Sequence, residues 1–131
     1  MSTVFEFTGR VPSKKNSRVT VRATGRSFPS KDYGLWHKAQ MASIMQQKEA
    51  LPKVIPRYNP RPTKFGVTIF LRFPTLGRAD LTNKAESIMD LLVDAGILRD
   101  DSWICVPMLT LFGTKDAANP GATVIIKEFI E

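Results

Sequence analysis

The fold is decided within residues 65–96, by the stretch FGVTIFLRF at 65–73 and the stretch ADLTNKAESIMDLLVDAG at 79–96. In the first stretch apolar side chains occupy every second position, which indicates a strand with one buried face. In the second, apolar residues recur at steps of four and three, a pattern typical of a helix with one narrow apolar stripe: Leu81, Ala85, Ile88, Leu92 and Ala95. Gly96 follows the last helical turn, where a residue free to take positive φ can close the helix. We therefore expect a central strand with a helix packed on its sheet.

The segments on either side add further strands and one more helix. Alternation at 3–7 and 123–130 predicts two strands, and the apolar run at 103–112 predicts a third, at an edge or a bulge because of Pro107. Apolar positions spaced by three to four residues predict a helix at about 32–51. The stretch at 9–30 is a basic loop or hairpin, and the proline-rich stretch at 52–64 is a basic loop. We expect one small α+β domain over residues 1–131, with a mixed sheet of four or five strands and two main helices chiefly on one face.

The composition excludes several classes of protein. With 131 residues, 43% hydrophobic and 24% charged, the chain should form a folded core. Its apolar runs are shorter than the roughly 18 residues of a membrane-spanning helix, and its first residues lack the layout of a secretory signal, so we expect a cytoplasmic protein. Cys105 and His37 are the only cysteine and histidine, so a metal ion would be held by oxygen ligands.

Charge is distributed unevenly along the chain, whose formal net charge is +7. Residues 1–78 hold 15 basic and 3 acidic side chains, whereas residues 79–131 hold 4 basic and 9 acidic ones. This layout is expected if one part of the protein grips a polyanion while the other collects divalent cations. The alternative is two solvated surfaces that neutralise each other on folding.

Acidic residues gather on the polar side of the helix predicted within 79–96. Thr82, Glu86 and Asp90 fall in one column, and neighbouring carboxylates in such a column repel each other. Asp80 opens the helix, and the pair at 100–101 follows its end. If the chain returns this pair to the polar side, the carboxylates converge and suit Mg²⁺ or Mn²⁺. Alternatively, Asp80 is only a helix cap and the pair only a turn, with Lys84 and Arg99 as compensating partners.

The same residues resemble a known family, the RusA-type Holliday junction resolvases. The stretch RADLTNKAESIMD at 78–90, with DAG at 94–96 and DD at 100–101, is similar to that family's signature of D-x-D-N-x-x-K, a further aspartate, a small residue with glycine, and a DD pair. The basic stretch GRVPSKKNSR at 9–18 resembles the family's N-terminal segment. The resemblance implies a RusA-like fold and a homodimeric, Mg²⁺-dependent endodeoxyribonuclease that cuts four-way DNA junctions in recombination and repair, in bacteria and their prophages.

The resemblance also implies site residues, with two departures from the family pattern. Thr82 stands in the place of the second aspartate and Glu86 in that of the lysine, so Glu86 could supply the missing carboxylate and Lys84 the missing cation. The catalytic residues are then expected to be Asp80, Asp101 and Lys84. The expected metal ligands are Asp80, Glu86, Asp90, Asp100 and Asp101. The expected contacts to DNA phosphates are Lys14, Lys15, Arg18, Arg22, Arg26 and Arg78.

Two other functions are compatible with the sequence. If Thr82 ends catalysis, the protein binds junctions or other nucleic acid without cutting them. Alternatively, it is a basic structural protein that binds RNA or an acidic protein. Among single residues, we expect His37 to be exposed, Cys105 and Trp103 to be packed in the core, and Phe70 to be a candidate wedge in a junction.

Overall fold

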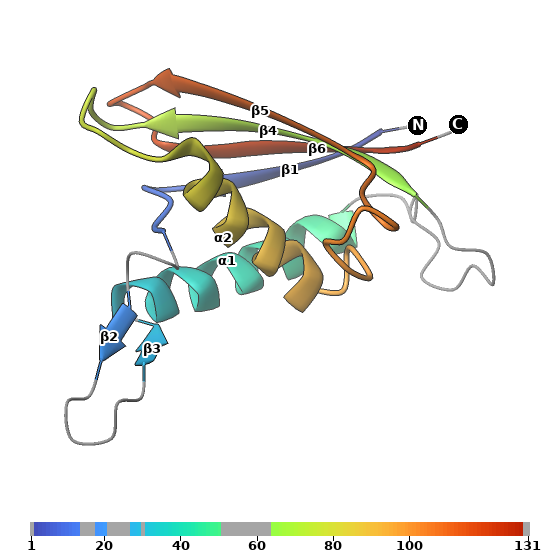
Figure 1. Ribbon diagram of the computed structural model, residues 1–131, viewed down its shortest axis with the longest axis horizontal. Coiled ribbons are helices and arrows are strands. Elements are labelled where there is room, and N and C mark those ends of the chain that lie inside the picture. The colour runs from blue at the N-terminus through green and yellow to red at the C-terminus, as the bar shows by residue number, and fades with distance from the viewer. Residues whose placement is uncertain (1, 14–17, 21–26, 30, 51–63, 130–131) are drawn as a thin grey trace.

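A mixed four-stranded sheet with two helices on one of its faces forms the protein (Figure 1). The computed structural model describes residues 2–13, 18–20, 27–29, 31–50 and 64–129. Its elements are β1 (Ser2–Thr8), β2 (Arg18–Thr20), β3 (Ser27–Pro29), α1 (Lys31–Ala50), β4 (Phe65–Phe73), α2 (Leu81–Asp94), β5 (Met108–Lys115) and β6 (Gly121–Glu128). The expected α+β class is confirmed. No helix in the described part of the chain is long and apolar enough to cross a membrane.

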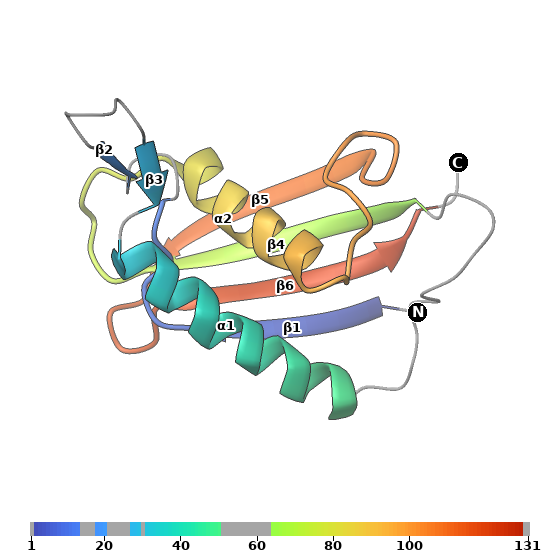
Figure 2. The ribbon, with the colours of Figure 1, turned by 90° about the horizontal axis from the view of Figure 1, so that it is seen from below.

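The sheet has the strand order β1-β6-β4-β5. β4 and β5 are parallel, whereas β6 pairs antiparallel with both β1 and β4. Parallel neighbours need a crossover connection, and α2 supplies it, so the chain passes from the end of β4 along α2 to the start of β5 (Figure 2). β2 and β3 pair antiparallel in a separate two-stranded sheet. Of the two alternatives predicted for residues 9–30, a basic loop or a hairpin, the pairing of these two strands supports the hairpin.

The core lies between β4 and α2. Val67, Ile69 and Leu71 alternate inward from β4, and Ile88 and Leu92 on α2 are equally buried, so both decisive patterns are confirmed. The buried stripe of α2 is wider than expected and includes Ala85, Ser87, Ile88, Met89, Leu91 and Leu92. Part of this burial comes from the segment after β1, since the Ser87 hydroxyl donates a hydrogen bond of 2.6 Å to the carbonyl of Pro12.

Two predictions for the second half of the chain are wrong in detail. β5 begins at Met108, not at 103, because residues 103–105 form a turn and proline at 107 cannot donate to the ladder. Trp103 consequently lies in that turn with 74% of its surface exposed, instead of packing in the core. Cys105 is buried, as expected.

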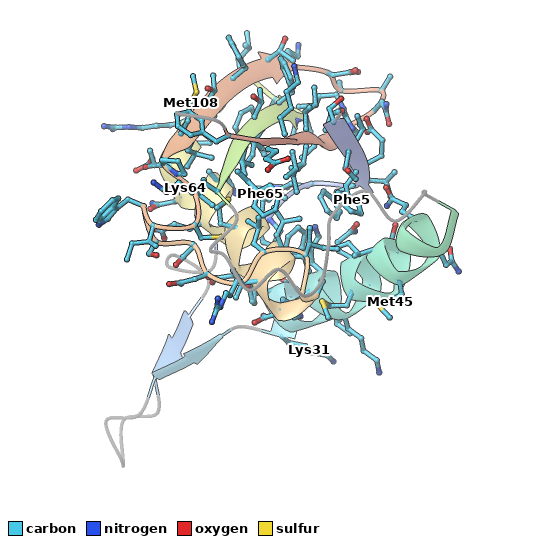
Figure 3. The ribbon with its side chains drawn as sticks, turned by 90° about the vertical axis from the view of Figure 1, so that its right-hand side faces the viewer. Phe5, Lys31, Met45, Lys64, Phe65 and Met108 are labelled. Atoms are coloured by element: carbon cyan, nitrogen blue, oxygen red, sulfur yellow. The ribbon has the colours of Figure 1, made fainter. Side chains whose placement is uncertain are left out.

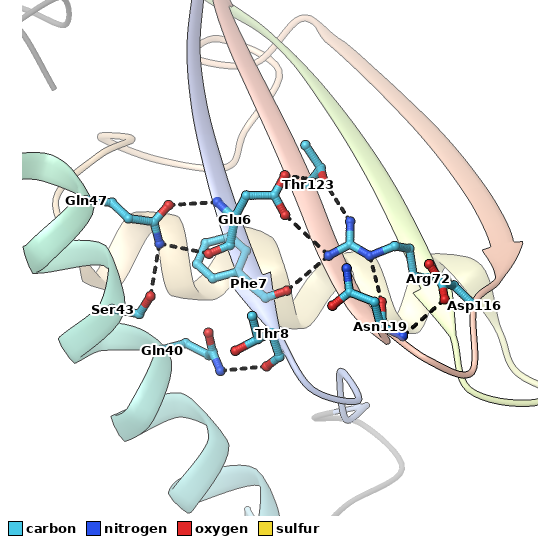
Figure 4. A network of polar contacts seen from close by, with 10 residues as sticks. All are labelled: Glu6, Phe7, Thr8, Gln40, Ser43, Gln47, Arg72, Asp116, Asn119 and Thr123. Carbon is cyan, nitrogen blue, oxygen red and sulfur yellow. Dashed lines mark hydrogen bonds and ion pairs between the residues drawn. The ribbon is translucent and has the colours of Figure 1, made fainter. Parts of the chain in front are cut away.

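A polar network joins three strands on the sheet face opposite the helices (Figure 4). The guanidinium of Arg72 on β4 donates hydrogen bonds to the carbonyl of Asn119 at 2.9 Å and to the hydroxyl of Thr123 at 2.7 Å. It also donates to the Glu6 carboxylate at 3.3 Å and to the Phe7 carbonyl at 3.4 Å. Arg72 thus donates to acceptors on β1, on β6 and in the loop before β6. These hydrogen bonds link the end of β4 to the neighbouring strands.

Arg72→Met should therefore lower the free energy of unfolding by about 1–3 kcal/mol, because it leaves half-buried acceptors without a donor. Urea unfolding followed by circular dichroism measures the change. Arg99→Met is the matched control, since Arg99 is exposed beyond α2, and it should change stability by less than about 0.5 kcal/mol. Equal stabilities for the two variants would contradict the structural role of the network.

Candidate nucleic-acid interface

A cationic cleft lies where β4 leads into α2. It has a volume of about 90 Å³ and is lined by the turn after β4, the start of α2 and the segment after β1. Four of its lining residues are basic, namely Arg10, Arg72, Arg78 and Lys84, and none of the described residues that line it is acidic. The guanidinium of Arg72 is bound to the Glu6 carboxylate in the network described above, so the other three supply the positive charge of the cleft. The cleft is therefore suited to an anion.

Local structure holds the basic side chains at this place. Gly9 takes a φ of 88° and its amide donates to the carbonyl of Pro120 at 2.9 Å, which turns the chain out of β1 just before Arg10. The next residue, Val11, is buried and anchors this segment in the core. Arg78 precedes α2, and Lys84 lies in the first turns of that helix. The cleft is therefore formed by two segments distant in sequence, the one after β1 and the one that begins α2.

The electrostatics of the cleft favour a negatively charged ligand. Burial lowers the pKa of the Lys84 ammonium, and the nearby charge of Arg10 lowers it further. An anion in the cleft would oppose both effects, because it stabilises the charged form of Lys84. The N-terminus of α2 adds a partial positive charge at the same end of the helix.

Asp80 is the carboxylate closest in sequence to this cleft. It is the N-cap of α2: its side chain accepts hydrogen bonds from the Thr82 amide at 3.0 Å and from the Thr82 hydroxyl at 2.7 Å. The cap interpretation is thus correct for Asp80, and the threonine that departs from the family pattern holds the aspartate in place. Asp80 is nevertheless exposed, next to cleft residues 78 and 79.

The Asp100–Asp101 pair lies at the other end of α2. Asp100 accepts a hydrogen bond from the Asp101 amide at 2.8 Å, and hydrogen bonds from Ser102 and then Asp101 lower the pKa of its carboxyl. α2 has 14 residues, which at about 1.5 Å per residue makes it about 21 Å long. Because β4 and β5 are parallel, α2 carries the chain back along the sheet, and the pair lands at the start of β5.

The expected convergence of the carboxylates is therefore wrong within one chain. No three histidine, cysteine, aspartate or glutamate side chains of the described residues come together as a metal site. Glu86 is exposed and Asp90 half-buried on α2, between the two ends. The five carboxylates expected to bind one metal ion are therefore spread along α2 and the segment after it.

Asp94, one helical turn after Asp90 on α2, has a partner on α1. The His37 imidazole Nε2 lies 2.8 Å from the Asp94 carboxylate, so His37 links the two helices and is half-buried, not exposed as expected. Tyr33, one turn earlier on α1, is buried; burial raises its pKa to about 12, with contributions from the charges of Asp90 and then Asp94. This side of α2 thus packs on α1.

Tyr33 should make the protein less stable at alkaline pH. Its pKa is raised from 10.0 to about 12 in the folded state, so between these values the unfolded chain loses the phenolic proton first and unfolding is favoured as pH rises. Tyr33→Phe should flatten this loss. Urea unfolding midpoints from pH 9 to 11 measure it, and parallel pH profiles for the variant and the wild type would contradict the assignment.

The described residues include only part of the expected DNA contacts. Lys14, Lys15, Arg22 and Arg26 lie outside them, and Arg18 is described only as a backbone position in β2. Arg78 does lie at the cleft. Arg10 and Arg72 were not predicted to belong with it; Arg10 stands in the basic stretch at 9–18, but only the fold shows that it meets α2.

The chain matches no protein-family model, and comparison with curated proteins finds no match either.

Proposed function

We propose that this protein binds the sugar-phosphate backbone of DNA through the cationic cleft, and that four-way junctions are its preferred DNA. The observation that carries the proposal is the grouping of Arg10, Arg78 and Lys84 around one cleft that no acidic residue lines in the described part of the chain. Lysine and arginine contacts to phosphates supply most of the affinity in such complexes. The preference for junctions rests on the resemblance to RusA-type resolvases.

Selectivity for junctions would come from shape and symmetry. Phosphate contacts position a protein on DNA but do not read its sequence. A four-way junction presents paired strands, so a two-fold symmetric homodimer would place one cleft on each of two equivalent strands. A cytoplasmic role in recombination and repair belongs to the same proposal.

Mg²⁺-dependent cleavage of the junction is the second candidate function. Asp80 favours it, because this exposed carboxylate is a hard oxygen ligand beside a cleft suited to phosphate. Mg²⁺ is often held by one or two carboxylates together with substrate phosphates. Binding ranks first because no three potential metal-ligand side chains come together among the described residues.

One experiment separates these functions. Labelled four-way junction and duplex DNA of equal length are titrated with the protein without divalent cation, and then incubated with Mg²⁺ or Mn²⁺. Tighter binding to the junction supports the first proposal, and metal-dependent nicking supports the second. Equal binding to both DNAs removes the junction preference, and tighter binding to RNA would favour the RNA-binding alternative.

The Asp80→Asn variant tests the origin of any cleavage. Asparagine caps helices as well as aspartate, so α2 should remain intact while a metal ligand is removed. Glu128→Gln makes the same change of charge at the far end of β6, opposite Phe65. Loss of nicking in the first variant alone, with binding retained in both, is the result expected if Asp80 holds the metal.

A further inference from the structure

The outer strand of the sheet, β5, is surrounded by exposed apolar side chains. Ten large apolar residues are exposed in the described part of the chain, and six of them lie on β5, next to it on β4, or in the turn before it: Phe70, Trp103, Ile104, Met108, Leu109 and Phe112. β5 pairs only with β4 among the described strands, so its other edge carries backbone groups that face no strand. Such an edge normally pairs or is protected by charged residues.

β5 is apolar on both of its faces. Phe112 pairs with Phe70 on the face opposite the helices, and their rings stack with centroids 5.0 Å apart at 8°. Met108 lies on that same face, away from the helices (Figure 3), whereas Leu109 and Leu111 lie on the helix face with Val67 and Ile69. Apolar residues on both faces are typical of a strand inside a sheet, not of a solvated edge.

We propose that β5 pairs antiparallel with β5 of a second copy of this chain, about a two-fold axis at Thr110, to form one continuous eight-stranded sheet. Directly opposite residues of an antiparallel pair share a face. With Thr110 facing Thr110 of the second copy, Leu109 faces Leu111 and Met108 faces Phe112. This register therefore joins apolar to apolar side chains on both faces and leaves the two threonines at the centre.

The charge of this strip favours a second copy over a nucleic acid. Residues 103–114 contain no charged side chain, although the whole chain carries +7. A polyanion would find no cation there, whereas two copies can meet along the strip without bringing like charges together. The pairing rests on the homodimer in the proposed function, and it involves no cleft residue, since β5 does not line the cleft.

Disulfide trapping tests the register directly. Antiparallel partners lie about 4.5–5.5 Å apart between Cα atoms, within the range that a disulfide bridges, so Thr110→Cys should cross-link two chains on mild oxidation. Thr114→Cys is the matched control on the same face of the same strand. Two Thr114 residues would be about eight positions apart along the paired strands, about 27 Å, so this variant should not cross-link. The wild type, with its buried Cys105, controls for the native thiol.

Sedimentation equilibrium without DNA tests the interface itself, so its outcome is independent of DNA binding. The wild type should sediment with twice the chain mass of 14.7 kDa. Thr110→Glu, which sets two carboxylates opposite each other, should raise the dissociation constant by at least about tenfold, and Thr114→Glu should leave it nearly unchanged. A monomeric wild type would overturn the proposal. So would a dimer whose dissociation constant is unchanged by Thr110→Glu and which Thr110→Cys does not cross-link.

Discussion

Gly121→Ala is expected to lower the free energy of unfolding by more than about 3 kcal/mol. Gly121 begins β6 with a φ of 149°, and it pairs with Thr8 on one side and Arg72 on the other. A Cβ atom at this position would lie 2.0 Å from the carbonyl oxygen of Phe7 and 3.1 Å from a guanidinium nitrogen of Arg72. Because the first of these atoms belongs to the backbone of the neighbouring strand, β1 and β6 would have to separate.

The control for this substitution is Gly34→Ala. Gly34 lies inside α1, and an added Cβ would meet no atom within 4 Å. Alanine is the better helix former, so this variant should gain about 0.5–1 kcal/mol. Urea unfolding of both variants gives the comparison. If Gly121→Ala were as stable as the wild type, the close pairing of β1 with β6 would be wrong.

Arg78→Ala combined with Lys84→Ala is expected to weaken binding to four-way junction DNA by about 10- to 100-fold. Both residues line the cleft. Without their positive charges, the protein loses the attraction to two phosphates and the release of counterions that accompanies each contact. The effect should be similar on duplex DNA, because both DNAs present the same phosphate backbone to the cleft. Fluorescence anisotropy at fixed salt measures the dissociation constants.

Arg99→Ala combined with Lys127→Ala is the control, because it removes one arginine and one lysine without touching the cleft. Arg99 follows α2, and Lys127 faces Gly66 near the start of β4, so both lie at the far end of the sheet from the cleft. This variant should bind within about threefold of the wild type, as expected for exposed charges beyond the screening distance of a bound phosphate. If both double variants bound junction DNA equally more weakly than the wild type, binding would depend on the net charge of the protein and not on the cleft.

The elements of the core could be predicted because their patterns are local. β4 alternates with a period of two, and the apolar residues of α2 recur every three to four positions, so each segment indicates its own structure and its own buried face. The order of the strands is not local information. The position of the Asp100–Asp101 pair depends on the parallel pairing of β4 with β5, and helix periodicity carries no information about that pairing.

The cleft could be predicted only in part for the same reason. Arg78 stands directly before a recognisable helix, and its place at the start of α2 follows from the sequence. Arg10 meets α2 only because Val11 is buried and the Ser87 hydroxyl binds the Pro12 carbonyl, although residues 12 and 87 are 75 positions apart. Likewise, the Asp94 carboxylate is bound by His37 of another helix, a pairing that no spacing within α2 indicates.

The salt dependence of junction binding tests most directly whether the cleft grips DNA phosphates. The logarithm of the association constant is measured against the logarithm of salt concentration for the wild type and for the variant with Arg78→Ala and Lys84→Ala. Each phosphate contact contributes a slope of about −0.9, so the variant's slope should be shallower by about 2. Identical slopes for the two proteins would show that DNA binds elsewhere and would contradict the cleft as the nucleic-acid interface.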